Sequence, residues 1–245
     1  MPYPKFNRDN LVVKKLSARK NKVFIEKDHV PVSKKPAKLS EFGQGLIEKT
    51  ADRIREAKKN QRSVMLTIGA HTIKNGMAPT LIALMEEGWV SHLATNGAGI
   101  IHDWEFAFQG ESSEDVRENV DRGQFGIWEE TGYYINLALV VGAYQGLGYG
   151  ESVGKMISEE GLQIPKIETL YAEATTNLKT NHELSAAAID LAGTIQKFEL
   201  QAGFMKIPHP FKKYSVQSRA FELGIPFTGH PMFGHDIIYN HPMNH

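Results

Sequence analysis

The chain of 245 residues contains no cysteine, so it can form neither disulfides nor thiolate metal sites. No apolar run reaches the roughly 18 to 20 residues that a membrane-spanning helix needs. The lysine-rich first thirty residues also lack the apolar stretch of a secretion signal. We therefore predict a globular, cytoplasmic protein without a membrane partner. Its hydrophobic content of 41% is sufficient for one large α/β domain.

The formal net charge is zero, but the charge is distributed unevenly. Residues 1–40 contain eleven Lys and Arg against three Asp and Glu, a balance of +8, so the remainder carries −8. A basic arm can bind nucleic acid, but neither a nucleic-acid motif nor an alternation of basic and aromatic residues accompanies this charge. We predict an extended basic arm over residues 1–40, solvated or lying across an acidic neighbouring subunit, with no nucleic-acid partner. A single domain over residues 41–245 follows it.

The first half of that domain predicts a strand, a helix and a strand. Ser40 can cap a helix over residues 41–60, where apolar residues recur at helical spacing. Residues 63–68 predict a buried strand, residues 74–87 a helix, and residues 89–95 a second strand. This order predicts a right-handed crossover and a mostly parallel sheet.

The rest of the chain predicts more helices and short strands. Ser112 or Ser113 can cap a short acidic helix that Gly123 ends. The apolar pattern predicts helices over residues 127–144, 152–160, 183–198 and 214–223, and strands over residues 166–171, 225–228 and 237–239.

Glycine-bearing turns follow both strands of the first unit. One is Gly69-Ala70-His71 and the other is Asn96-Gly97-Ala98-Gly99. Glycine lets backbone N–H groups approach a phosphate or nucleotide, and the N-terminus of a following helix favours anions. Neither turn has the full G-x-G-x-x-G spacing, so a plain structural turn remains an alternative.

His102 and Asp103, followed by Glu105, are candidates for acid–base chemistry. A histidine can serve as a general base when a carboxylate orients it. Neighbouring residues in a strand or loop point to opposite sides, however, so His102 and Asp103 need not act together. The alternative role for Asp103 is to cap a helix.

Two other groups of titratable residues are candidates for binding a metal or a cation. The last 37 residues contain His209, His230, His235, His241 and His245, together with Asp236. Their spacing matches neither an H-E-x-x-H nor an H-x-H ligand arrangement, so no metal site is predicted. Glu129-Glu130 could hold a polyamine or a metal, or could form the first turn of the following helix.

Three runs of sequence resemble the deoxyhypusine synthase family: Thr67–Asp103, Phe125–Gly132 and Gly224–Ile238. The resemblance extends from about Leu46 to His245 and depends on the order and spacing of these runs. It implies a Rossmann-like α/β fold with helices on both faces of the sheet, bound NAD, and a homotetramer with active sites at subunit interfaces. Members of this family oxidise a polyamine to an imine and pass the aminoalkyl group to an acceptor amine on a protein.

The resemblance also assigns site residues. Asp103 matches a family aspartate, whereas Ile101 and His102 stand in place of an acidic pair. We therefore expect His102 or His235 to move a proton, and Asp103 and Asp236 to attract the cationic amine. The expected NAD contacts are Ala70, His71, Lys74, Asn96, Gly97 and Ala98.

The family's catalytic lysine falls in a C-terminal segment that would follow His241. The resemblance therefore implies a domain that lacks this segment. The alternative function is a catalytically incompetent or partner-requiring family member that binds NAD without the lysine-dependent transfer.

Overall fold

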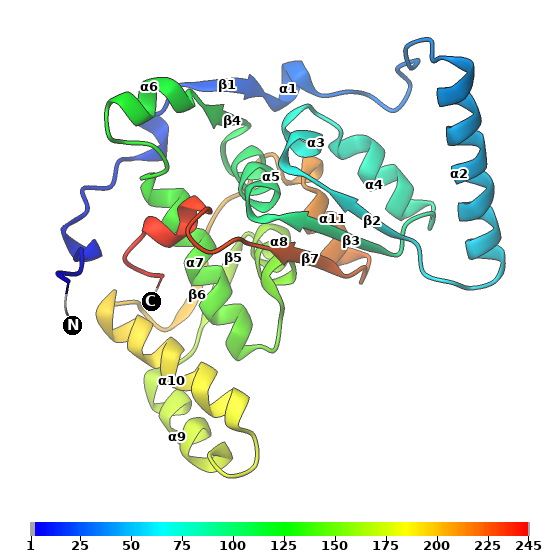
Figure 1. The fold of residues 1–245 in the computed structure, drawn as a ribbon. Helices are drawn as coiled ribbons and strands as arrows, with labels where there is room; N and C mark the ends of the chain where they lie inside the picture. The colour runs from blue at the N-terminus through cyan, green and yellow to red at the C-terminus, as the bar shows by residue number, and fades with distance from the viewer. Residues whose placement is uncertain (1–2, 245) are drawn as a thin grey trace.

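Figure 1 shows the fold in a computed structural model that describes residues 3–244. A three-stranded parallel sheet lies at its centre, with β2 (Met65–Ile68), β3 (His92–Asn96) and β7 (Phe227–His230) in the order β2-β3-β7. Ala94 of β3 pairs with Thr67 on one side and with Thr228 on the other. Helices flank this sheet, so the predicted Rossmann-like α/β class is confirmed.

The connection from β2 to β3 contains two helices where the sequence predicts one. They are α3 (Ala70–Lys74) and α4 (Ala78–Glu86). Gly76 separates them, with φ at +81°, and a Cβ added to it would lie 2.1 Å from the Asp28 carbonyl oxygen. Only glycine can adopt this conformation without strain at such a close approach, so the chain turns here.

The stretch after β3 is a helix, α5 (Gly97–Gln109), and not the turn-rich strand end that its glycines predict. Asn96 caps it by accepting a hydrogen bond of 3.0 Å from the Gly99 amide. A Cβ on Gly99 would lie 2.1 Å from Thr95 Oγ1, so the helix can start this close to the strand only with glycine there. Helical spacing then places residues 98, 101, 102 and 105 on neighbouring positions of one side.

Several predicted helices are confirmed with small changes of boundary. They are α2 (Glu41–Lys59), α7 (Glu129–Tyr144), α8 (Tyr149–Glu159), α10 (His182–Lys197) and α11 (Val216–Glu222). Figure 1 shows α10 lying beside α9 (Ile167–Asn177) below the sheet. Residues 3–244 contain no helix with the length and apolar character to cross a membrane.

Four short elements differ from the predictions. Ser112 and Ser113 lie in a strand, β4 (Glu111–Glu114), and Asp115 caps the acidic helix α6 (Val116–Asp121). The region predicted as a strand over residues 166–171 is instead the start of α9. The strand in this part of the chain is β5 (Gly161–Ile164), which ends before Pro165. β5 pairs antiparallel with an unpredicted strand, β6 (Gly203–Lys206). Residues 237–239 form part of the 3₁₀ helix η4 (Ile237–Asn240).

The basic arm packs against its own chain. It contains the 3₁₀ helices η1 (Arg8–Asn10) and η2 (Leu16–Ala18), the strand β1 (Asn21–Phe24) and the short helix α1 (Ile25–Asp28). β1 pairs antiparallel with β4, and the side chains of Leu16 and Ile25 are buried. The arm is therefore more than a solvated tail.

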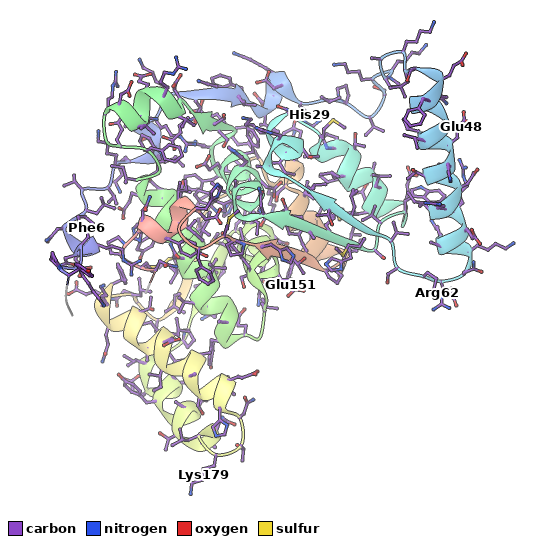
Figure 2. The ribbon with its side chains drawn as sticks, in the orientation of Figure 1. Phe6, His29, Glu48, Arg62, Glu151 and Lys179 are labelled. Atoms are coloured by element: carbon purple, nitrogen blue, oxygen red, sulfur yellow. The ribbon has the colours of Figure 1, made fainter. Side chains whose placement is uncertain are left out.

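The helix α2, which follows the arm, stands at the margin of the molecule (Figure 1). None of its residues is buried. Figure 2 shows Glu48 on this helix, far from Lys179 at the tip of the α9–α10 pair. The parallel sheet and α5 lie between these two parts of the molecule (Figure 1).

Candidate functional site

A pocket of about 200 Å³ lies beside the N-terminal half of α5. Five separate parts of the chain form its wall: the arm, α3, α5, the β4–α6 region with the loop after it, and the segment before η4. This is the edge at which the parallel strands end, where open α/β sheets place ligands. The lining residues are Arg19, Lys74, Ala98, Ile101, His102, Glu105, Ser113, Glu114, Val116, Phe125, His235, Asp236 and Ile237.

The structure brings some of the predicted site residues into this pocket and leaves others outside it. Those in the pocket are Lys74, Ala98, His102, His235 and Asp236. The other predicted residues are Ala70, His71, Asn96, Gly97 and Asp103, which do not line it. The predicted acid–base residues and one predicted carboxylate therefore share a single cavity, although they come from positions 102 to 236.

Asp236 closes over the start of α5. Its carboxylate lies so near Gly97 that a Cβ there would be 2.3 Å from Asp236 Oδ1. Asp236 Oδ2 also accepts a hydrogen bond of 2.6 Å from the Met232 amide. A helix N-terminus favours negative charge, so this carboxylate is well placed at the pocket wall.

Asp103 has a structural role that corrects its predicted contact with substrate. Its carboxylate is buried and accepts hydrogen bonds from Ser215 Oγ at 2.6 Å, the Val216 amide at 2.9 Å, and the amide and side chain of Gln217 at 3.1 and 3.0 Å. Burial raises the pKa of Asp103, and these hydrogen bonds oppose the rise. Asp103 on α5 thus caps the start of α11. Helix capping is the alternative role that the sequence predicts for Asp103, although it does not identify the helix.

Glu105 is the carboxylate of α5 that serves the pocket. Arg19 Nη1 and Nη2 donate to its two oxygens at 2.8 and 2.6 Å, and both side chains are about 1–2% exposed. Thr131 Oγ1 donates to Glu105 Oε1 at 2.9 Å, and Ser112 Oγ donates to Oε2 at 2.5 Å. Burial acts to raise the pKa of Glu105, but Arg19 outweighs it, so the pKa lies below its ordinary value. Glu105 is therefore ionised at neutral pH.

His102 connects to Glu105 through Ser112. His102 Nδ1 lies 2.7 Å from Ser112 Oγ. Burial lowers the pKa of His102; the charge of Glu105 opposes this, whereas Lys74 and Arg19 lower it further. The imidazole is thus neutral at pH 7 and able to accept a proton.

Glu114 and Ser113 are polar residues of the wall that sequence patterns did not identify as site residues. Glu114 accepts hydrogen bonds from Trp128 Nε1 at 2.9 Å and Asn119 Nδ2 at 2.6 Å, and burial raises its pKa. Ser113 has a φ of +73° within β4, and such strain is more common at functional sites than elsewhere. No sequence signal marks the φ of Ser113.

The C-terminal histidines do not assemble around one point. His230 Nε2 lies 2.9 Å from Thr228 Oγ1, and His209 is buried beside the ring of Trp104. His241 stacks on Phe198, and His245 lies outside the described residues. Throughout residues 3–244, no three His, Asp or Glu side chains are grouped so that they could hold a metal ion.

The acidic pair at positions 129 and 130 forms the first turn of α7, as the structural alternative predicts. Glu130 Oε2 accepts a hydrogen bond of 2.6 Å from the Leu16 amide of the arm. Glu129 lies 3.8 Å from His241 Nε2. Neither residue lines the pocket.

Comparison with known proteins leaves the family open. The chain matches no family model, and no curated protein matches it. The resemblance to the deoxyhypusine synthase family remains a prediction, and any function has to be argued from the pocket.

Proposed function

We propose that this protein is an NAD-dependent enzyme of the deoxyhypusine synthase-like type that oxidises a small amine and passes its aminoalkyl group to an acceptor amine. The observation that carries the proposal is the neutral, oriented imidazole of His102 in a pocket with carboxylates. His102 belongs to the hydrogen-bonded chain that ends at the ionised Glu105.

The charges and the lining of the pocket suit an amine with an alkyl chain. Arg19 neutralises Glu105, which leaves the carboxylates of Glu114 and Asp236 against the single cation of Lys74. A charged hydrogen bond to an ammonium group contributes about 1.5–3 kcal/mol. The apolar side chains beside these carboxylates suit methylene groups, and they belong to Ile101, Val116, Phe125 and Ile237.

His102 is the proposed base. It removes a proton from the amine nitrogen as the neighbouring carbon loses a hydride, which leaves a carbon–nitrogen double bond. His235 lines the same pocket and is the second candidate for proton transfer. Asp236 holds the cationic amine before it is deprotonated.

The strand edge has features that fit NAD. When bound, NAD accepts the hydride. Within residues 3–244, the buried hydroxyls of Thr95 and Tyr149 have no hydrogen-bond partner, and Thr95 directly precedes the predicted contacts Asn96 and Gly97. Lys74 offers a cation for a phosphate. One feature limits the fit: Asp236 lies against Gly97, so the phosphates belong nearer Lys74 than the start of α5.

Self-association is part of the proposal. The side of the molecule near the pocket exposes apolar residues to solvent, including Val116 at 54%, Val120 at 56% and Phe233 at 93%. Exposed apolar residues that form a contiguous patch mark protein interfaces. A homo-oligomer, with a tetramer as the expected form, would cover them.

The alternative is a protein that binds NAD and an amine without transfer. Lys74 is the lysine that lines the described part of the pocket, and its proposed role is to bind the cofactor. The amine-transfer step would then depend on a lysine from another chain. Oxidation without transfer to any acceptor would favour this alternative.

The proposal is tested by incubating the protein with NAD and a panel of polyamines, and by following NADH absorbance and product mass. His102→Gln should lower the rate about 100-fold or more, because a positioned base contributes at least that factor. His182→Gln, on the exposed start of α10, is the matched control. If the wild-type protein neither binds NAD nor turns over any amine, the proposed function is wrong.

Cofactor binding is measured separately by calorimetric titration with NAD. Lys74→Ala should weaken binding about tenfold, because it removes one charged contact. Lys179→Ala, at the remote tip of the α9–α10 pair, should leave it unchanged (Figure 2). Equal affinities for these two variants would contradict the role of Lys74.

A further inference from the structure

We infer that Arg19, Glu105 and Ser112 form a positioning chain that fixes His102 as the Nδ1–H tautomer and leaves Nε2 as the basic nitrogen. The consequence for catalysis rests on the proposed function, whereas the tautomer itself follows from the hydrogen bonds. These residues come from the arm, α5 and β4, so three separate parts of the polypeptide determine the tautomer of one imidazole.

The direction of the hydrogen bonds in the positioning chain depends first on the charge of Glu105. Both of its oxygens accept hydrogen bonds from the guanidinium of Arg19, at 2.8 and 2.6 Å, and Thr131 donates to one of them. Arg19 carries no acceptor and remains protonated in proteins. An ionised carboxylate can only accept hydrogen bonds, so Glu105 offers no hydrogen to Ser112.

The direction of the next bond follows. Ser112 Oγ lies 2.5 Å from Glu105 Oε2, and two oxygens at this distance need a hydrogen between them. The only hydrogen available is that of the serine hydroxyl, which has a single hydrogen to donate. Ser112 is completely buried, so no solvent competes for this bond.

The tautomer of His102 is then determined. Its Nδ1 lies 2.7 Å from Ser112 Oγ, whose hydrogen is already directed to Glu105. The serine oxygen can therefore only accept from His102, which requires a hydrogen on Nδ1. In the neutral imidazole the lone pair is then on Nε2, and this nitrogen makes no hydrogen bond within residues 3–244.

The same chain supports the protonated state during turnover. When Nε2 takes a proton, Nδ1 keeps its hydrogen bond to Ser112. Ser112 is in turn hydrogen-bonded to Glu105, whose negative charge favours the imidazolium. No proton needs to move along the chain. Arg19, Glu105 and Ser112 therefore act through His102 as positioning residues, and the basic arm contributes directly to the site.

The test is a nitrogen-15 NMR measurement of histidine tautomers in the full chain, with the His102 signals assigned by their loss in His102→Gln. At neutral pH we expect His102 of the wild-type protein to be neutral with its proton on Nδ1. A proton on Nε2, or an imidazolium at neutral pH, would overturn the inference. This measurement needs neither cofactor nor substrate.

Ser112→Ala provides the second measurement. Alanine is smaller than serine and fits the buried position, so the fold should be kept. We expect the Nε2–H tautomer to become dominant at His102. Ser158→Ala removes another serine that bonds to a glutamate, 3.3 Å from Glu222, and should leave the His102 signals unchanged. An unchanged tautomer in Ser112→Ala would contradict the positioning chain.

Activity separates this inference from the proposed function. If amines are oxidised, Ser112→Ala should lower kcat about tenfold or more and alter the pH profile, because the basic nitrogen is no longer fixed. Unchanged kcat and pH profile would overturn the positioning role. The expected tautomer without any amine turnover would refute the proposed function and leave the hydrogen-bonded chain established.

Discussion

The burial of His209 makes the stability of the protein depend on pH. The side chain is about 1% exposed and lies among the rings of Trp104 and Phe108, and neither ring nitrogen has a hydrogen-bond partner of normal geometry within residues 3–244. Burial lowers its pKa from 6.5 to about 4. The imidazole is therefore buried in its neutral form.

The sign and size of the effect follow from linkage. Between pH 6.5 and 4 the unfolded chain binds a proton at His209 that the folded chain does not bind, so the free energy of unfolding falls as the pH falls. The contribution of the neutral imidazole is complete above pH 6.5. With about 1.36 kcal/mol per pKa unit, the loss is about 2 kcal/mol at pH 5 and about 3 kcal/mol at pH 4.

His209→Leu should remove this dependence. Leucine matches the apolar surroundings, so we expect stability at pH 7 to change little. Urea unfolding, followed by tryptophan fluorescence at pH 7 and pH 5, should show a wild-type loss about 2 kcal/mol larger than that of the variant. His182→Leu, at an exposed position, should retain the wild-type dependence. If His209→Leu and the wild-type protein lose the same stability, His209 is not the group responsible.

Two further substitutions test the packing around α5. Asp103→Ala should lower the free energy of unfolding by about 2–4 kcal/mol in thermal or urea unfolding, because buried donors at the start of α11 lose their acceptor; a change below about 0.5 kcal/mol would refute this capping role. Gly97→Ala should cost about 1–3 kcal/mol, because the new Cβ would lie 2.3 Å from Asp236. Gly193→Ala, a helical control with no atom within 4 Å, should be neutral or stabilising by up to about 1 kcal/mol, and equal costs for the two would contradict the contact.

The elements with strong periodicity could be predicted from the sequence. The strands around residues 65 and 92 and the long helices α2, α7 and α10 follow from apolar spacing and caps. β6 could not be predicted in this way, because three of its four residues are exposed and it is stabilised by pairing with β5. The split between α3 and α4 also depends on a distant contact, that of Gly76 with the Asp28 carbonyl.

The start of α5 shows why local propensity was misleading. Two glycines in the first three residues are typical of a loop and weaken a helix. Here a close neighbour requires each glycine: Asp236, far away in the sequence, lies against Gly97, and Thr95, at the end of β3, lies against Gly99. The cap at Asn96 was the one local sign of a helix.

The residues of the site could be predicted only in part, because their contacts also depend on the tertiary fold. Once α5 is a helix, His102 and Glu105 are neighbours at i and i+3, which makes Glu105 the orienting carboxylate in place of Asp103. Arg19 and Ser112 join them from the arm and β4, and no local pattern relates position 19 to position 105. The sequence thus supplied His102, and the tertiary fold supplied the residues that position it.

The carboxylates of the pocket come only in part from the positions that the resemblance to the deoxyhypusine synthase family assigns to substrate-binding acids. At the positions of the family's acidic pair, this chain has Ile101 and His102, and its matching aspartate, Asp103, caps α11. The carboxylates that remain are Glu114, at the end of β4, and Asp236, directly before η4. Burial raises the pKa of Glu114, and the positive charge of a bound ammonium would oppose this rise and favour the ionised carboxylate. The pocket should therefore select an amine by the positions of Glu114 and Asp236, and its preferred amine need not be the family's substrate.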